Sequence, residues 1–328
     1  MRGVDRLTIT DFTPRDLDDA CRLLAARHAR HVEAEPLLDP RFAELDAARE
    51  ALSPYCAETC AAGSVARRGD AVVGYLVGAP KSVDPWGPNM WVDPPSMALA
   101  ADEPAETARE LYAHAAAGWV ESGATAHYVV VPSHDEALVD AFFRLGFGMQ
   151  QVYAAREPAP GAPSIPDDLR LRPARREDIP VLARLDLALP EHQGKSPVFS
   201  AGGTPSLDEA LQEWEDDFDD PTFRTVVVEH AGGVVGAAVT CALEKSSMHT
   251  GIALLDNAGY LGFAAVLPDA RGLGAGRALG EDAIAWAAEA GHRSIATDFR
   301  ATNVHSSRAW TALGFRPTFL RLHRLIGY

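Results

Sequence analysis

The chain has 328 residues, of which 47% are hydrophobic and 23% are charged, and its formal net charge is −16. This composition is typical of a soluble globular protein, and the length favours two domains. The negative charge argues against non-specific nucleic-acid binding, and no apolar run approaches the ~18 residues of a membrane-spanning helix. The first residues lack the apolar core of a signal peptide, so we expect a cytoplasmic protein.

In the first half, alternating or apolar runs predict strands and amphipathic runs predict helices. Strands are expected at residues 7–10, 64–68, 71–79, 97–101, 127–131 and 147–155. Helices are expected after the N-cap residue Thr13, within 32–62, and at 103–121 and 136–145. The proline-rich residues 80–95 predict a loop. His28 and His31 lie three apart on the first helix, and we interpret them as a solvated face rather than a pair of metal ligands.

A proline-rich segment, residues 158–168, divides the chain and predicts a linker between domains at 1–157 and 169–328. Beyond it, strands are expected at residues 169–172, 224–230, 234–243, 260–267 and 294–299. Helices are expected at 176–187, 207–218 and 277–290, with a loop over 190–206. No group of His and Cys residues has the spacing of a metal site, so no metal is expected.

The two halves resemble each other. Residues 69–74 (GDAVVG) match 231–236 (AGGVVG) at an offset of 162, and Asp16 matches Asp178 at the same offset. Residues 145–147 and 313–315 both read LGF, at an offset of 168. This low-identity repeat predicts one fold used twice rather than an array of short repeats.

A strand, a glycine-rich loop and a helix follow one another over residues 259–277, where 271–276 read RGLGAG. Glycines allow a ligand to approach the backbone, and the N-terminus of a helix attracts anions. Arg271 and Arg277 add charge-assisted contacts to a phosphate. The matching residues 100–106 of the first half have no glycine and three carboxylates, so we expect no phosphate ligand there.

Residues 271–276 resemble the acyl-CoA loop of the GNAT acetyltransferase superfamily, whose pattern is Gln/Arg-x-x-Gly-x-Gly/Ala. Residues 265–268 resemble the strand that leads into that loop, and Asn303 followed by Leu313-Gly314-Phe315 resembles the family's later signature. The resemblance covers both halves and implies a tandem GNAT protein with a degenerate N-terminal domain. The implied fold class is α/β (α+β), with two mixed, mostly antiparallel twisted sheets flanked by helices.

The resemblance also implies which residues hold the co-substrate, acetyl-CoA. The backbone of Val266 would pair with the pantetheine arm, the N–H groups of residues 272–277 would bind the pyrophosphate, and Asn303 would contact the arm. The implied cofactor-binding residues are Ala265, Val266, Arg271, Gly272, Leu273, Gly274, Ala275, Gly276, Arg277, Asn303 and Ser306.

The implied reaction is attack of an amine on a thioester, which requires loss of a proton from the amine. Asp298, five residues before Asn303, stands where many GNAT enzymes have a glutamate base. The family's usual proton donor is a tyrosine, but that position is Trp310, whose indole N–H is no usable acid. The acid role is therefore unnecessary, supplied by solvent, or moved to another residue, for which Tyr260 is a candidate.

The expected activity is therefore transfer of an acetyl group from acetyl-CoA to a small-molecule or peptide amine by residues 169–328. A non-catalytic acyl-CoA-binding or interaction protein with this fold is the alternative, because the tyrosine is missing. Residues 190–218 and 244–258 would wall the acceptor site. The acidic residues of 213–217 form either a solvated helix face or a cation-attracting surface. The identity of the amine stays open.

Overall fold

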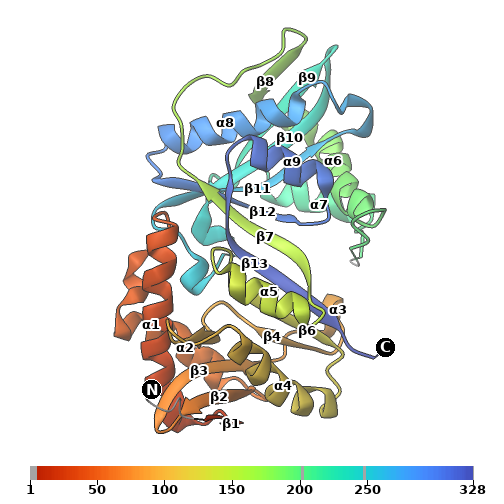
Figure 1. Cartoon of the computed structure of the whole chain (residues 1–328). Helices are drawn as coiled ribbons and strands as arrows, with labels where there is room; N and C mark the ends of the chain where they lie inside the picture. The colour runs from red at the N-terminus through yellow and green to blue at the C-terminus, as the bar shows by residue number, and fades with distance from the viewer. Residues whose placement is uncertain (1–5, 201–202, 247–248, 328) are drawn as a thin grey trace. The chain divides into compact units, whose positions relative to one another are not determined.

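A computed structural model describes residues 6–200, 203–246 and 249–327. The chain forms two compact units (Figure 1). Unit 1 comprises Met1–Val152, Thr250–Leu254 and Pro317–Tyr328, and unit 2 comprises Tyr153–His249 and Leu255–Arg316. The division into consecutive domains at residues 157 and 169 stays a prediction. Among the described residues, no helix combines the length and the apolar character needed to cross a membrane.

Unit 1 contains an antiparallel sheet in the order β1-β2-β3-β5, and β4 pairs in parallel with β6. The strands are β1 (Leu7–Asp11), β2 (Ala62–Arg68), β3 (Ala71–Gly78), β4 (Asn89–Val92), β5 (Met97–Leu99) and β6 (Ala126–Pro132). The helices are α1 (Leu17–Ala34), α2 (Leu45–Ala57), α3 (Val83–Trp86), α4 (Glu106–Glu121) and α5 (Glu136–Arg144). The last described strand, β13 (Arg316–Leu325), pairs antiparallel with β6, so it adds a strand to the β4–β6 pair rather than to the antiparallel sheet.

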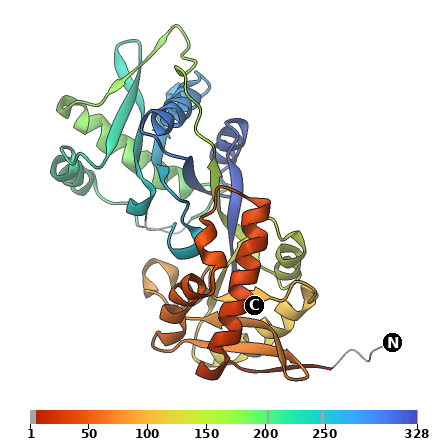
Figure 2. The same ribbon diagram turned by 90° about the vertical axis from the view of Figure 1, so that its left-hand side faces the viewer.

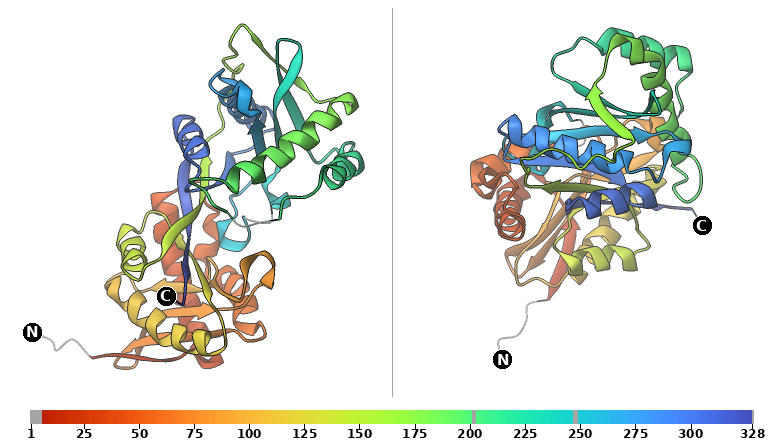
Figure 3. Two further views of the ribbon diagram at one scale, coloured as in Figure 1. Left: turned by 90° about the vertical axis from the view of Figure 1, so that its right-hand side faces the viewer. Right: turned by 90° about the horizontal axis from the view of Figure 1, so that it is seen from above.

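Unit 2 contains the strand order β12-β11-β10-β9-β8, in which only the β11–β12 pair is parallel. The strands are β8 (Leu169–Pro173), β9 (Arg224–His230), β10 (Gly233–Ala242), β11 (Ala258–Val266) and β12 (Ser294–Arg300), and β7 (Gly148–Arg156) begins in unit 1 and ends in unit 2. The helices are α6 (Ile179–Gln193), α7 (Leu207–Asp217), α8 (Ala275–Glu289) and α9 (Val304–Ala312). Figure 3 shows α6 and α8 on opposite faces of this sheet.

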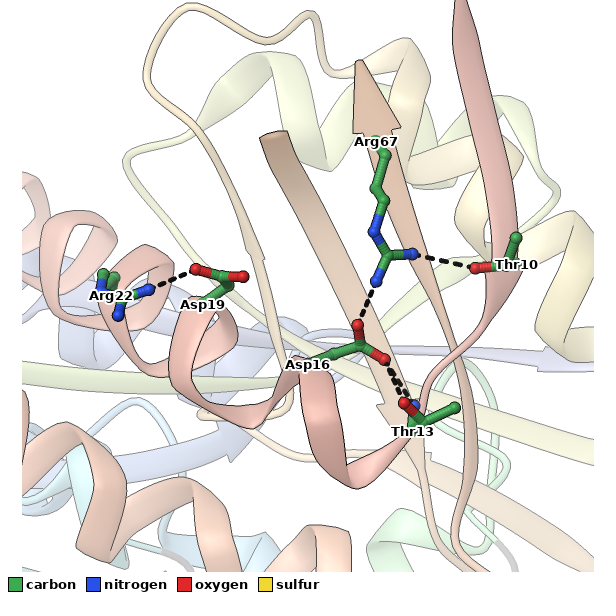
Figure 4. A network of polar contacts seen from close by, with 6 residues as sticks. All are labelled: Thr10, Thr13, Asp16, Asp19, Arg22 and Arg67. Carbon is green, nitrogen blue, oxygen red and sulfur yellow. Dashed lines mark hydrogen bonds and ion pairs between the residues drawn. The ribbon is translucent and has the colours of Figure 1, made fainter. Parts of the chain in front are cut away.

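The start of each half is held by an equivalent aspartate, which supports the internal repeat. Thr13 donates from its backbone N–H and its hydroxyl to Asp16, at 2.7 and 2.8 Å, and Arg67 donates to the other oxygen of the same carboxylate (Figure 4). In the second half, the N–H of Arg175 donates to Asp178 at 2.7 Å, and Arg172 donates to both Asp178 oxygens at 2.6 and 2.9 Å. Each buried carboxylate thus satisfies backbone donors at the helix start and an arginine at once.

Two expectations about unit 1 are wrong. Residues 80–95 are not one loop, because they contain α3 and the fully buried strand β4. The prolines flank that strand without removing one of its pairing N–H groups. His28 and His31 do not form a solvated face, because both are completely buried on α1, the long red helix of Figure 2.

The burial of these histidines depends on segments distant in sequence. His28 Nε2 lies 2.8 Å from the backbone carbonyl oxygen of Asp39, which makes it the donor in that bond. The ring of His31 stacks on His134 at 4.6 Å and packs edge-on against Phe319 at the same distance. Burial lowers the pKa of His28 to about 4 and that of His31 to about 2.

Candidate functional site

The site in unit 2 begins where two paired strands separate. β11 and β12 are paired from Ala258 opposite Ser294 to Leu261 opposite Thr297, and the pairing ends there. The hydroxyl of Thr297 donates to the Leu261 carbonyl at 3.0 Å and closes the paired part. Among the residues that the structure describes, β11 continues to Val266 paired with β10 alone. The second edge of β11 is therefore open to an added extended chain.

A β-bulge lies at the point of separation. Val239 of β10 pairs with Phe263, and the next residue, Thr240, pairs with Leu261, so Gly262 is the extra residue of β11. A bulge reverses which alternate residues face each side of a sheet. Before it, Gly259 faces Trp286 of α8; after it, Val266 faces the start of that helix. Tyr260 therefore lies on the opposite face from α8.

The hydrogen bonds of β11 indicate which backbone groups face its open edge. The N–H of Leu267 donates to the Val235 carbonyl of β10 at 2.8 Å. In an antiparallel ladder the direction of these groups alternates along the strand. The N–H and C=O groups of Val266 and Ala264 consequently point away from β10, toward the open edge. An extended amide-containing arm can pair with them as a further strand.

The glycine loop lies at the end of this edge. Gly272 and Gly274 have φ values of 87° and 89°, a left-handed region in which residues with a Cβ are strained, and Gly274 is the N-cap of α8. A Cβ at Gly272 would meet no atom within 4 Å, so the loop leaves space above its backbone. The first N–H groups of α8 have no partner within the helix and attract an anion.

The two loop arginines differ in their surroundings. Arg277 Nε donates to Glu281 at 2.7 Å, and the second oxygen of Glu281 accepts the N–H of Ser164 at 2.7 Å. Arg271 is exposed and lines the cleft above the loop. Arg271 is therefore the arginine better placed to contact a ligand phosphate directly.

The far wall of the cleft is the start of α9. Asn303 is its N-cap, and its side-chain oxygen accepts the N–H of Ser306 at 3.3 Å and lies 3.4 Å from His192 Nε2. His192, in the last turn of α6, was not predicted from the sequence, because only the fold brings it to Asn303. Partial burial lowers its pKa, the bond to Asn303 opposes this change, and the positive charge of Arg271 lowers the pKa further.

These walls enclose a cleft of about 400 Å³. Every predicted cofactor-binding residue except Leu273 lines it. The lining members of that set are Ala265, Val266, Arg271, Gly272, Gly274, Ala275, Gly276, Arg277, Asn303 and Ser306. The cleft thus combines an open strand edge with the N-terminus of a helix, which attracts anions.

Trp310 lines the same cleft and is 8% exposed. Its ring packs against Phe315 at 6.0 Å. A Cβ added at Gly280 of α8 would lie 3.1 Å from the indole ring. Trp310 therefore joins α9 to α8 by packing, and its indole supplies no acid at neutral pH.

The two predicted catalytic residues contact each other at the start of the separation. The hydroxyl of Tyr260 donates to Asp298 Oδ1, and the Tyr260 ring covers Gly262, where a Cβ would lie 2.8 Å from Cε1. Asp298 is the first residue of β12 beyond its pairing with β11. Burial, followed by the Asp298 charge, raises the pKa of Tyr260 far above its usual value.

Two of the acidic residues of residues 213–217 on α7 bond to other side chains of the protein. Glu215 bonds to Arg176 at 2.6 Å, and Asp216 accepts from Gln212 at 2.8 Å. Both contacts lie on the exposed surface of the helix. They favour the interpretation of this segment as a solvated face.

Comparisons with known proteins agree with this geometry. Residues 189–315 match the model of the acetyltransferase (GNAT) family. A GCN5-related N-acetyltransferase from Sphaerobacter thermophilus superposes with a TM-score of 0.58 at 15% identity, covering 99% of this chain and 98% of that chain. A tandem GNAT protein from the clavulanic acid biosynthesis pathway superposes with a TM-score of 0.51 at 16% identity, covering 98% and 99%.

A third similar structure is a GCN5-related glucosamine N-acetyltransferase region of a fungal multi-domain β-N-acetylglucosaminidase, with a TM-score of 0.54 and 15% identity over 98% of this chain and 38% of that one. A search of curated proteins found no match. At these identities the structures show the fold alone, and they confirm the tandem GNAT architecture. Residues 189–315 therefore match the acetyltransferase (GNAT) family, and the likeness in fold to the tandem GNAT structures extends over 98–99% of the chain.

Proposed function

We propose that this protein is an N-acetyltransferase that transfers the acetyl group of acetyl-CoA to a small-molecule or peptide amine, with its activity in residues 169–328. The family match supports acyl transfer in general. The observation that carries the finer proposal is the cleft, in which the open edge of β11 leads directly to the glycine loop. That order matches a ligand with an amide-containing arm followed by a pyrophosphate.

The residues present fit such a ligand. The backbone groups of Ala264 and Val266 bind and orient the extended arm. The space above Gly272 and the N–H groups that begin α8 accommodate the pyrophosphate, and Arg271 adds positive charge. Asn303 holds the start of α9 beside the arm. Acetyl-CoA bound there supplies the thioester carbon that the amine attacks.

Asp298 and Tyr260 are the groups we assign to proton movement. Asp298 accepts the proton that the amine loses, directly or through a water. Tyr260 takes over the donor role that Trp310 does not provide, because its hydroxyl already bonds to Asp298. Protonation of Asp298 removes the negative charge that opposes ionisation of Tyr260, so the donor becomes more acidic once the base has worked.

We assign no co-substrate to unit 1, because its own side chains occupy the equivalent strand edge. Arg27 of α1 is buried and donates to the backbone carbonyls of Met97 and Pro94. Arg30 donates to the Leu99 carbonyl at 3.2 Å. Glu103, in the region that corresponds to the glycine loop, forms a two-bond ion pair with Arg68 at 2.8 Å.

The test is turnover of acetyl-CoA with a panel of amines, followed by thiol release, for the parent protein and Asp298→Asn. We expect the variant to bind acetyl-CoA with the parent's affinity and to lose about a hundredfold or more in turnover. Asn keeps the size of the side chain, so a folding defect is not expected. Equal turnover by parent and variant would reject the base assignment.

The second candidate is a non-catalytic acyl-CoA-binding protein, which the tryptophan at position 310 favours. Calorimetric binding of acetyl-CoA without thiol release on any amine of the panel would support it. No binding of acetyl-CoA would reject both candidates.

A further inference from the structure

A buried histidine of unit 2 lies beside the proposed base. His249 is 1% exposed, and its Nε2 atom lies 4.0 Å from Asp298 Oδ1. Its ring packs against Tyr153 of β7 at 5.1 Å and against Tyr260 at 5.5 Å. His249 precedes β11 in a connecting segment, and none of the sequence motifs points to it.

Two groups converge on one oxygen of the Asp298 carboxylate. The Tyr260 hydroxyl donates to Oδ1, and the His249 imidazole, from the segment that precedes β11, lies near the same atom. Only 12% of the Asp298 side chain is exposed, so the surroundings limit its rotation. Contacts of this kind favour the ionised form of a carboxylate and hold its plane in one orientation.

The other titratable groups around His249 come from four strands. Tyr153 and Tyr260 contact its ring, Asp298 lies beside Nε2, and Cys241 of β10 lies near Tyr260. Burial raises the pKa of Cys241 to about 11 and that of Tyr260 still higher, so both are neutral at pH 7. Among these named groups, the Asp298 carboxylate is the one that His249 Nε2 approaches.

We propose that His249 is a positioning residue for Asp298 in the acetyl transfer proposed above, holding the carboxylate oriented toward the separation of β11 and β12. The effect of His249 on catalysis rests on the proposed function, but the contact between His249 and Asp298 can be tested without measuring turnover. His249 does not contact the cleft that would hold acetyl-CoA.

Two substitutions separate this role from simple packing. His249→Gln keeps an N–H donor at about the position of Nε2, whereas His249→Met fills a similar volume without a donor. In His249→Met we expect the acidic limb of the kcat/KM profile to move up by about one pH unit, because Asp298 loses a contact that favours its charge. We expect kcat to fall about tenfold and the acetyl-CoA Kd to stay within about twofold. His249→Gln should restore most of both changes.

His292→Met is the matched control. His292 contacts Trp286 and Asn257 rather than Asp298, so the acidic limb should stay in place. A direct measurement accompanies the kinetics: the pKa of Asp298, followed by carboxyl carbon NMR and assigned with Asp298→Asn. We expect this pKa to rise in His249→Met and to return in His249→Gln.

An unchanged Asp298 pKa and an unchanged acidic limb in His249→Met would overturn the inference. Equal losses of kcat in His249→Met and His249→Gln, accompanied by lower melting temperatures, would also overturn the inference and would indicate that His249 has only a packing role. If the parent binds acetyl-CoA but acetylates no amine, the proposed function fails, and the NMR titration still decides whether His249 controls the Asp298 carboxylate.

Discussion

Gly276 offers the sharpest test of the anion site, because stability and binding are expected to change in opposite directions. It lies in the first turn of α8, lines the cleft, and is not among the glycines with positive φ. A Cβ there would have ordinary contact, with its nearest neighbour, Val266 Cγ2, at 3.8 Å. Gly276→Glu and Gly276→Gln therefore fit the backbone and differ from each other in charge.

The size of the effect follows from electrostatics. A carboxylate about 5 Å from a phosphate charge, at an effective dielectric constant of about 20, costs about 3 kcal/mol, or roughly a hundredfold in Kd. Salt screening at the cleft entrance reduces this to about tenfold. Replacing a helical glycine also stabilises the fold by about 0.5 kcal/mol, so the melting temperature should rise.

Calorimetry with acetyl-CoA measures the first quantity and a melting curve the second. We expect Gly276→Glu to bind at least about tenfold more weakly than Gly276→Gln. Gly118→Glu is the control, because it adds the same charge to an exposed helical position of α4 in unit 1 and should leave Kd unchanged. Equal affinities for the Glu and Gln variants of Gly276 would refute the assignment of the pyrophosphate to this helix start.

Three further predictions follow from other contacts. The pKa of buried His28 is lowered to about 4, so its contribution to stability is complete above pH 6.5 and is lost as the pH falls toward 4. Urea unfolding at a series of pH values should show that the free energy of unfolding falls by about 3 kcal/mol over this range because of His28, and that it falls less in His28→Gln. An equal pH dependence in the parent and in His28→Gln would contradict this prediction. Asn303→Ala should lower stability by about 1 kcal/mol through loss of the α9 cap, while Asn303→Ser keeps a cap; equal melting temperatures would argue against capping. Tyr260→Phe should reduce kcat about tenfold to a hundredfold without changing the acetyl-CoA Kd, as thiol release and calorimetry would show, and unchanged kcat would exclude Tyr260 as the donor.

Local sequence was sufficient for the parts of this protein that depend on local chemistry. The glycines of residues 271–276 allow positive φ values and close approach of a ligand, so their pattern alone indicates the turn into α8. The internal repeat of the two halves also follows from local chemistry, because Asp16 and Asp178 each accept a hydrogen bond from a backbone N–H three residues away. The boundaries of most strands and helices followed from period and composition.

Tertiary structure alone decided which residues meet. The bond between Tyr260 and Asp298 joins residues 38 apart, and it depends on the parallel pairing of β11 with β12. His249 and His192 reach the site from segments without a motif. The burial of His28 and His31 depends on contacts with Asp39 and Phe319, which lie outside α1 and cannot be inferred from its helical periodicity. The periodicity of a helix or strand indicates only which of its faces is buried on average. Strand register, bulges and distant strands determine which side chains share a site, and these depend on contacts between residues far apart in the chain.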